Sequence, residues 1–504
     1  NLLSNAFKYT DEGSITVKVY ESEDNLKIEV SDTGAGIPAG KQDRIFERFY
    51  QIAKERNIEA FTDKTGNVIM RVPATPGYEN KKGIVLQGHM DMVPQKNADT
   101  VHDFENDPIE TYVDGDWLKA KGTTLGADNG LGLALGMAML ESKDIQHGPL
   151  ELLATYDEET GMTGAMALEP GILKGEILIN LDSEEEGELC IGCAGGLDAT
   201  AHHKYERKPM PDNHLCYSFA VKGFSGGHSG IEINKCRANA NKVAARIIYA
   251  LLTEADVKLL DMEGGTLRNA IPRECFTTLY VPANRVEQAK AIIDTIFAQV
   301  KNEYLVTDPN CHYLFEPYTC SENETCDPDE CLYVEESTAI RYMQTIIACP
   351  DGVERMSDQM PGLVETSNNM AIVTIYKGDF YVKCLMRSSV DSAKDLLALK
   401  IRSLFALANI DIEFDGGYSG WAPNADSEIL RIMKQTYTDM FGKEPHVMAV
   451  HAGLECGILS GAYPNWDMIS CGPTLVSPHS PDERCYIPSV QKVWNYLLEV
   501  VKNV

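Results

Sequence analysis

A histidine and an aspartate stand two residues apart directly after an apolar run. The run 84–87 ends at Gly88, and His89-Met90-Asp91 follows it. This pattern predicts a buried strand that delivers His89 to its carboxyl end. A histidine that binds a metal usually donates its second ring N–H to a carboxylate, and Asp91 could orient His89 in this way. For the tripeptide alone, a structural histidine beside a turn aspartate is the alternative.

Further acidic residues stand at the ends of other predicted strands or in glycine-rich loops. They are Asp128 before the predicted helix 130–142, Glu158 and Glu159 after the strand 150–155, and Asp182 after the strand 177–181. A carboxylate such as Asp128 can bridge two cations, because each of its oxygens has free lone pairs; an ordinary helix N-cap is the alternative. Adjacent carboxylates such as Glu158 and Glu159 repel each other unless cations or protons separate them.

A second histidine lies about three hundred residues downstream, in the loop Ser477-Pro478-His479-Ser480-Pro481-Asp482-Glu483. Two histidines with three or four carboxylates form a ligand set suited to two zinc ions, although Mn²⁺ or Co²⁺ can use the same ligands. Such a pair of ions polarises a carbonyl and activates a water, and one carboxylate remains to take the proton. The set therefore predicts metal-assisted hydrolysis.

The order of these motifs resembles one family over residues 53–504. The segments concerned are Gly88-His89-Met90-Asp91, Gly126-Ala127-Asp128-Asn129-Gly130, Glu158-Glu159-Thr160-Gly161, Asp182, Gly226-Gly227-His228-Ser229-Gly230, His451-Ala452-Gly453-Leu454-Glu455 and Pro478-His479. They resemble the bacterial aminoacyl-histidine (Xaa-His, β-alanyl-histidine) dipeptidases of the di-zinc family that also includes carboxypeptidase G-like enzymes and aminoacylases.

The resemblance implies a role for each site residue. His89 and Asp182 would hold one zinc, Glu159 and His479 the other, and Asp128 would bridge them. Asp91 would orient His89. Glu158 would be the general base that activates the water and later protonates the leaving amine.

The resemblance also implies a lid domain that closes over the metals and that in relatives forms a dimer interface. His228, Asn269 and Arg387 resemble lid groups that hold the scissile carbonyl and the substrate carboxylate. An arginine suits a free carboxylate because it binds it bidentately. A turn histidine, a turn asparagine and a solvated arginine are the alternatives. His451 and Glu455 stay outside the predicted site, as further contacts.

The first fifty residues differ from the rest. A helix-like segment 1–10, a predicted β-hairpin over 14–20 and 26–31, the glycine segment 32–38 and the aromatic segment 45–50 follow in order. They resemble the N box, first glycine box and F box of sensor histidine kinase ATPase domains, in which Asn5 would hold Mg²⁺ and Asp32 would contact adenine. The second glycine-rich box is not found. A truncated ATPase fragment over residues 1–52, with no nucleotide cofactor, is therefore expected.

The charge balance excludes two classes of partner. The chain has 504 residues, with 45 Lys and Arg against 75 Asp and Glu, a formal charge of −30. Neither nucleic acid nor an anionic membrane surface is an expected partner for such a chain. No apolar run approaches the roughly 20 residues that span a bilayer, and residues 1–10 lack a signal-peptide pattern. A cytoplasmic location is expected.

The 14 cysteines fit a reducing compartment and are interpreted as free thiols. Four of them lie in an acidic segment, at Cys311, Cys320, Cys326 and Cys331. Their irregular spacing lacks the paired pattern of a zinc site, so loop thiols are favoured over a metal ligand set.

The alternation of strands and helices predicts an α/β fold with a mostly parallel sheet. Four segments are expected: the ATPase-like fragment 1–52, the first part of a catalytic domain over 53–196, an inserted α+β lid and dimerisation domain over 197–418, and the second part of the catalytic domain over 419–504. The family usually begins with a helical segment where the ATPase-like fragment stands here. Such an exchange can leave an apolar sheet face uncovered. Each Å² of apolar surface left in water would cost about 25 cal/mol of folding free energy.

The predicted function is a di-zinc dipeptidase that cleaves short peptides such as Xaa-His dipeptides. A homodimer through the lid is compatible with the resemblance. Three alternatives remain: an aminoacylase on the same scaffold, a nucleotide-binding signalling module, and a chimeric or misassembled reading frame. The chain does not begin with Met, which indicates a cut or incomplete start.

Overall fold

The computed structural model describes residues 15–22, 25–32, 53, 55–56, 58–318 and 332–504, and only the backbone within 15–32. Strands β1 (Ile15–Ser22) and β2 (Asn25–Asp32) pair in an antiparallel hairpin in which Ser22 lies opposite Asn25. The predicted hairpin is therefore confirmed. The helix-like segment 1–10 and the nucleotide-box segments after Asp32 lie outside the described residues.

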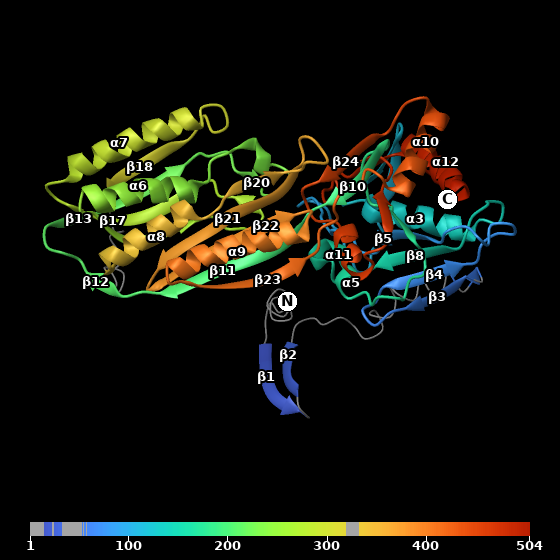
Figure 1. The fold of residues 1–504 in the computed structure, drawn as a ribbon, viewed down its shortest axis with the longest axis horizontal. Helices are drawn as coiled ribbons and strands as arrows, with labels where there is room; N and C mark the ends of the chain where they lie inside the picture. Colours follow the sequence, from blue (N-terminus) through green and yellow to red (C-terminus); the bar gives the residue numbers. More distant parts are fainter. Residues whose placement is uncertain (1–14, 23–24, 33–52, 54, 57, 319–331) are drawn as a thin grey trace.

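An eight-stranded sheet forms the first lobe (Figure 1). In spatial order its strands are β24 (His446–Val450), β10 (Glu188–Cys193), β25 (Asp467–Ser470), β9 (Ile177–Asn180), β5 (Ile84–His89), β8 (Leu150–Thr155), β4 (Val68–Val72) and β3 (Glu59–Thr62). The pairings among β25, β9, β5 and β8 are parallel, whereas β4 and β3 add antiparallel strands at one edge. The centre of the sheet is therefore parallel, and the carboxyl ends of its strands meet at one edge.

Helices cover both faces of this sheet. One face packs with α3 (Ala127–Glu141), α10 (Glu428–Phe441) and α12 (Ile487–Asn503), and the other packs with α5 (Thr163–Met166) and α11 (Glu455–Ala462). Every residue of β5, β8 and β9 is buried. Parallel strands buried on both faces are continuous apolar runs, as 84–86 is. No apolar face of these three strands is left uncovered.

A nine-stranded antiparallel sheet forms the second lobe. Its strands, in spatial order, are β18 (His312–Pro317), β13 (His214–Lys222), β17 (Cys275–Pro282), β15 (Lys258–Gly264), β21 (Val364–Tyr376), β22 (Asp379–Ser388), β11 (Gly195–Lys204) and β23 (Asp411–Tyr418), with β20 (Gly352–Met356) paired to β21. Burial alternates along β22, so this sheet buries one face.

Four helices pack on the second sheet and close its core (Figure 1). They are α6 (Ala240–Glu254), α7 (Val286–Glu303), α8 (Glu336–Ala348) and α9 (Asp391–Leu407). The start of α6 is fixed by Asn239, whose side chain accepts hydrogen bonds from the backbone N–H groups of Asn241 and Lys242. Apolar residues on the inner faces of the helices fill the space above the sheet.

Short elements complete the described chain. They are α4 (Glu158–Gly161), the 3-10 helix η1 (Ile233–Lys235), the pair β12 (Arg207–Pro209) and β19 (Leu332–Val334), the pair β14 (Gly227–His228) and β16 (Ala270–Ile271), and the sheet β26 (Leu475–Val476), β27 (Arg484–Tyr486), β7 (Trp117–Ala120), β6 (Thr111–Asp114). The last of these, the small four-stranded sheet, joins residues far apart in sequence.

The α/β class with a mostly parallel sheet and an α+β lobe is confirmed. Of the four cysteines in the acidic segment, Cys311 is buried, and the other three lie outside the described residues. Within the described part of the chain, no helix is long and apolar enough to cross a membrane.

Candidate metal centre

His89 ends strand β5 at the carboxyl edge of the parallel sheet. The glycine before it allows α3 to approach closely, because a Cβ atom at Gly88 would lie 2.0 Å from Asn129 Oδ1. Asn129 in turn donates a hydrogen bond from Nδ2 to the Leu181 carbonyl (2.6 Å). The start of α3 is thereby held between the ends of β5 and β9, which places Asp128 beside His89.

Asp128 contacts both predicted histidine ligands. Its Oδ1 lies 3.1 Å from His89 Nε2, and its Oδ2 lies 3.2 Å from His479 Nε2. The two oxygens of one carboxylate therefore face two different imidazoles, which come from positions 390 residues apart in the chain. This is the arrangement that a bridging ligand requires.

The remaining predicted ligands divide between the two histidines. Asp182 Oδ1 lies 3.4 Å from His89 Nε2, and Glu159 Oε2 lies 3.0 Å from His479 Nε2. Ligand atoms of His89, Asp128 and Asp182 lie within 4.8 Å of one another, and so do those of Asp128, Glu159 and His479. We call His89 with Asp182 the inner half-site and Glu159 with His479 the outer half-site.

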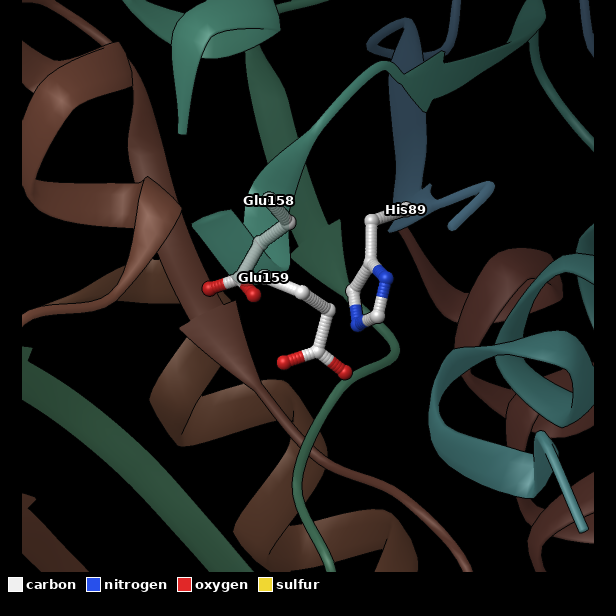
Figure 2. A group of neighbouring side chains, drawn as sticks. All are labelled: His89, Glu158 and Glu159. Atoms are coloured by element: carbon white, nitrogen blue, oxygen red, sulfur yellow. The ribbon is translucent and has the colours of Figure 1, made fainter. Parts of the chain in front are cut away.

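Glu158 belongs to a third group with His89 and Glu159, whose ligand atoms also lie within 4.8 Å of one another. Figure 2 shows the two glutamates leaving adjacent backbone positions, with the Glu159 carboxylate next to the His89 imidazole. Asp91 holds this segment, because its Oδ1 and Oδ2 accept hydrogen bonds from the backbone N–H groups of Glu158 and Glu159, both at 3.0 Å. The His89 Nδ1 atom lies 3.0 Å from the Asp91 carbonyl oxygen and 3.5 Å from Oδ1. Asp91 thus contacts both the His89 imidazole and the backbone of Glu158 and Glu159.

The pKa values of the ionisable groups in the site indicate that the site favours bound positive charge. Burial, followed by the neighbouring Asp182 charge, raises the pKa of Glu158 to about 8. Burial and the Asp128 charge raise the pKa of Glu159 to about 7. Burial lowers the pKa of His89, but hydrogen bonds to Asp128, Asp182 and Asp91 outweigh it and raise that pKa overall.

The donor set fits divalent cations. Glu159 Oε1 is buried without a hydrogen-bond partner, and an orphaned buried carboxylate oxygen is costly unless a cation binds it. Among the described residues, the ion pairs of Asp128, Asp182 and Glu159 are made with His89 and His479, not with Lys or Arg. Mixed imidazole and carboxylate ligands suit zinc or a similar metal.

The predicted substrate residues gather at the lid lobe. A Cβ atom at Gly230 would lie 3.0 Å from His228 Cε1, 3.3 Å from Arg387 Nε and 2.2 Å from the His451 carbonyl oxygen, so these groups crowd around one glycine. Arg387 is buried, and its Nε has no hydrogen-bond partner. Asn269 is exposed, and its carbonyl accepts a hydrogen bond from Ser229 N–H (2.8 Å).

His228 is held in one tautomer. Its Nδ1 accepts hydrogen bonds from the backbone N–H groups of Gly230 and Ile231, both at 3.1 Å. Burial and the nearby Arg387 charge lower the pKa of His228, which favours the neutral ring. A neutral imidazole that accepts at Nδ1 carries its proton on Nε2, so His228 can donate one hydrogen bond to a ligand.

Three buried groups around the site were missed by sequence reasoning or left out of it. Glu455 Oε2 accepts hydrogen bonds from Gln87 Nε2 (2.6 Å) and Thr155 Oγ1 (2.7 Å) beneath the strand ends. His451 Nε2 lies 2.7 Å from Ser367 Oγ of the lid lobe. Glu483 contacts the loop that carries Asp128. The motif that contains His451 and Glu455 was a sequence signal for these two residues, whereas no sequence pattern pointed to Glu483.

The fold and this site define a metal-dependent hydrolase, and comparison with known proteins agrees. The family model for peptidase family M20/M25/M40 matches residues 85–503. The chain is 44% identical to the cytosol non-specific dipeptidase of Escherichia coli (strain K12), over 93% of this chain and 94% of that protein. It is also similar to the crystal structure of aminoacylhistidine dipeptidase from Vibrio alginolyticus, with a TM-score of 0.86, 43% identity, and 93% and 94% of the two chains covered. The chain belongs to peptidase family M20/M25/M40.

The start of the chain matches a different family. The model for histidine kinase-, DNA gyrase B-, and HSP90-like ATPases matches residues 1–72. A stretch of 53 residues is 49% identical to the aerobic respiration control sensor protein ArcB of Escherichia coli (strain K12), covering 10% of this chain and 7% of that protein. The predicted resemblance of residues 1–52 to a truncated kinase ATPase domain is thereby confirmed.

Proposed function

We propose that the chain is a two-zinc dipeptidase whose metal ions share Asp128. The observation that carries the proposal is the division of the Asp128 carboxylate, with Oδ1 toward His89 and Oδ2 toward His479. His89 and Asp182 would hold the inner ion, and Glu159 and His479 the outer ion. When bound, two such ions would supply Lewis-acid polarisation of the scissile carbonyl and of the attacking water.

Glu158 is the proposed general base. It comes from the same short helix as Glu159, and the Asp91 carboxylate fixes the backbone of both residues. Its carboxylate faces the ligand cluster without being needed for the two ligand triplets that contain Asp128. Glu158 would take a proton from the attacking water and return it to the leaving amine.

The lid cluster supplies groups for the ends of a dipeptide. Arg387 is buried, and its Nε is left without a hydrogen-bond partner. A guanidinium in this state suits the free carboxylate of a short peptide, because it forms two parallel hydrogen bonds with it. His228 Nε2–H would donate to the scissile carbonyl oxygen, and Asn269 would add a polar contact. The names of the two relatives favour dipeptides, including Xaa-His dipeptides, as substrates.

The reaction can be tested directly. Purified full-length chain with added Zn²⁺ is expected to hydrolyse Ala-His and carnosine, whereas matched N-acetyl amino acids should be poor substrates. Preference for the N-acetyl amino acids would favour an aminoacylase. A folded chain that cleaves none of these compounds would contradict the proposal.

Domain boundaries, cellular location, oligomeric state and nucleotide binding are also proposed. We infer a catalytic unit formed by residues 53–196 and 419–504, a lid over 197–418, a cytoplasmic location, and compatibility with a homodimer through the lid. No nucleotide is expected to bind, because the ATPase-like segment lacks its second glycine-rich box. Equilibrium binding of labelled ATP to the full chain tests this, and saturable binding would contradict it.

A further inference from the structure

Glu483 is a buried acidic residue that the proposed reaction does not use. It is 2% exposed and lies at the end of the loop that carries His479. Lone buried carboxylates are rare in proteins because removing a charge from water is costly. The partners of Glu483 therefore indicate what the residue does.

The Glu483 carboxylate accepts hydrogen bonds from four consecutive backbone N–H groups. Oε2 accepts from Leu125 (2.7 Å) and Gly126 (3.0 Å), and Oε1 accepts from Ala127 (2.8 Å) and Asp128 (3.2 Å). These donors lie more than 350 residues earlier in the chain. Hydrogen bonds to an ionised acceptor are stronger than neutral ones, so the carboxylate fixes the backbone path of the loop.

Three of these N–H groups, at the N-cap Gly126 and at Ala127 and Asp128, belong to the start of α3, where the first N–H groups have no partners inside the helix. The Leu125 N–H lies one residue before the N-cap. Gly126 stands at the N-cap position and makes no side-chain cap. An aspartate in the first turn, such as Asp128, would ordinarily turn its carboxylate toward these groups. Because Glu483 already satisfies them, both oxygens of Asp128 remain free to face His89 and His479.

Glu483 also fixes the loop of the second histidine. The backbone N–H of Glu483 donates to the Ser480 carbonyl (2.9 Å), one residue beyond His479. Directly after Glu483, strand β27 pairs with β7, with Arg484 opposite Lys119. A small apolar cluster that includes Leu125, Ala127 and Cys485 packs beneath this junction. The small four-stranded sheet thus brings Glu483 to the loop 125–128.

We propose that Glu483 is a positioning residue that holds Asp128 and His479 in register for the outer cation. This inference rests on the proposed metal centre. In Glu483→Gln the side chain keeps its size, but one of its two acceptor oxygens becomes an NH₂ group that faces backbone donors. The Asp128 loop then loses part of its anchor while the core stays filled.

The test compares metal binding of the full-length wild type, Glu483→Gln and Asp482→Asn. Asp482 is the neighbouring exposed acid, so its substitution removes the same charge without touching the loop 125–128. Zinc competition with a chromophoric chelator should show at least tenfold weaker binding of one ion by Glu483→Gln, with unchanged binding by Asp482→Asn. The midpoint of thermal unfolding of each metal-free variant separates this effect from a general loss of stability.

The outcomes are distinguishable. Zinc binding by wild type with equal binding by Glu483→Gln overturns the positioning role and leaves the proposed function intact. A wild type that binds no zinc overturns both. If Glu483→Gln does not fold, hydrogen exchange of the metal-free wild type decides. Slow exchange of the amides at 125–128 is expected, and exchange at the rate of an unstructured peptide would overturn the inference.

Discussion

The two half-sites of the candidate metal centre are built differently. In the inner half-site, His89 ends one central parallel strand and Asp182 follows another, and their side chains are 1% and 13% exposed. In the outer half-site, the His479 side chain is 51% exposed and its residue has a φ of 60° in an irregular loop. The inner ligands are positioned by the sheet itself, whereas the outer histidine depends on contacts between distant loops.

The difference shows how one sheet edge and one loop can share a reaction centre. Asp128 contacts the histidine of each half-site, and its backbone is held by Glu483 and by the neighbouring Asn129, which donates to the Leu181 carbonyl. The inner half-site is therefore expected to be preorganised, and the outer one to depend on its supports.

Replacing Asp128 by alanine should affect both half-sites and cause the largest loss. Removal of the shared ligand is expected to lower kcat/KM on Ala-His roughly 10⁴-fold, because both ions lose their common anchor. Metal analysis of the purified Asp128→Ala protein should give fewer than two ions per chain. Full metal content in this variant would contradict the bridging role.

Replacing Glu158 by glutamine should leave both half-sites loaded and stop the proton transfer. Loss of a general base is expected to lower kcat roughly 10³-fold while the metal content stays near that of wild type. Steady-state kinetics and metal analysis of the same preparation provide the measurement. If Glu158→Gln loses its metal instead, the roles of Glu158 and Glu159 must be exchanged.

Arg387 lies outside both half-sites, and its substitution should spare them. In Arg387→Lys the charge remains but the bidentate geometry is lost, so KM for dipeptides is expected to rise roughly tenfold to a hundredfold. Peptide amides, which lack the free carboxylate, provide the matched control and should show little change between variant and wild type. A similar loss for both substrate types would argue against a carboxylate contact.

The smallest expected effect is a difference in affinity between the half-sites themselves. Stepwise chelation of the loaded wild type should remove the outer ion first, at roughly tenfold lower chelator concentration than the inner ion. His479→Ala should keep about one ion per chain, bound with the tighter affinity. Loss of both ions in a single step would contradict the comparison.

The sequence predicted the inner half-site better than the outer one for a physical reason. The runs 84–87 and 177–181 are mainly apolar because their strands are buried on both faces, and each leads to an inner ligand at its end. No periodic pattern surrounds His479, which alone would be a loop residue, so it was connected to the site by its residue type within the ligand set and by the family resemblance. Glu483 looks like half of a solvated Asp-Glu pair, since its partners are backbone groups 355 to 358 residues away.

In the lid lobe too, the sequence predicted the regular elements better than the contacts that depend on tertiary packing. The sequence predicted an inserted α+β lobe, and its helices α6, α7 and α9 pack apolar residues into the core of that lobe. The thirteen-residue strand β21 was missed, since its first half is the polar stretch Thr366-Ser367-Asn368-Asn369, buried at the junction of the lobes. The contact between Ser367 and His451 depends on that tertiary packing, which local patterns do not encode.

The central claim is that two cations share the carboxylate of Asp128. Anomalous diffraction at the zinc edge, from crystals of the zinc-loaded full chain, tests it most directly. Two peaks are expected, roughly 3.5–4 Å apart, with one Asp128 oxygen on each, His89 on the inner ion and His479 on the outer ion. A single peak, or two peaks that do not flank Asp128, would contradict the account.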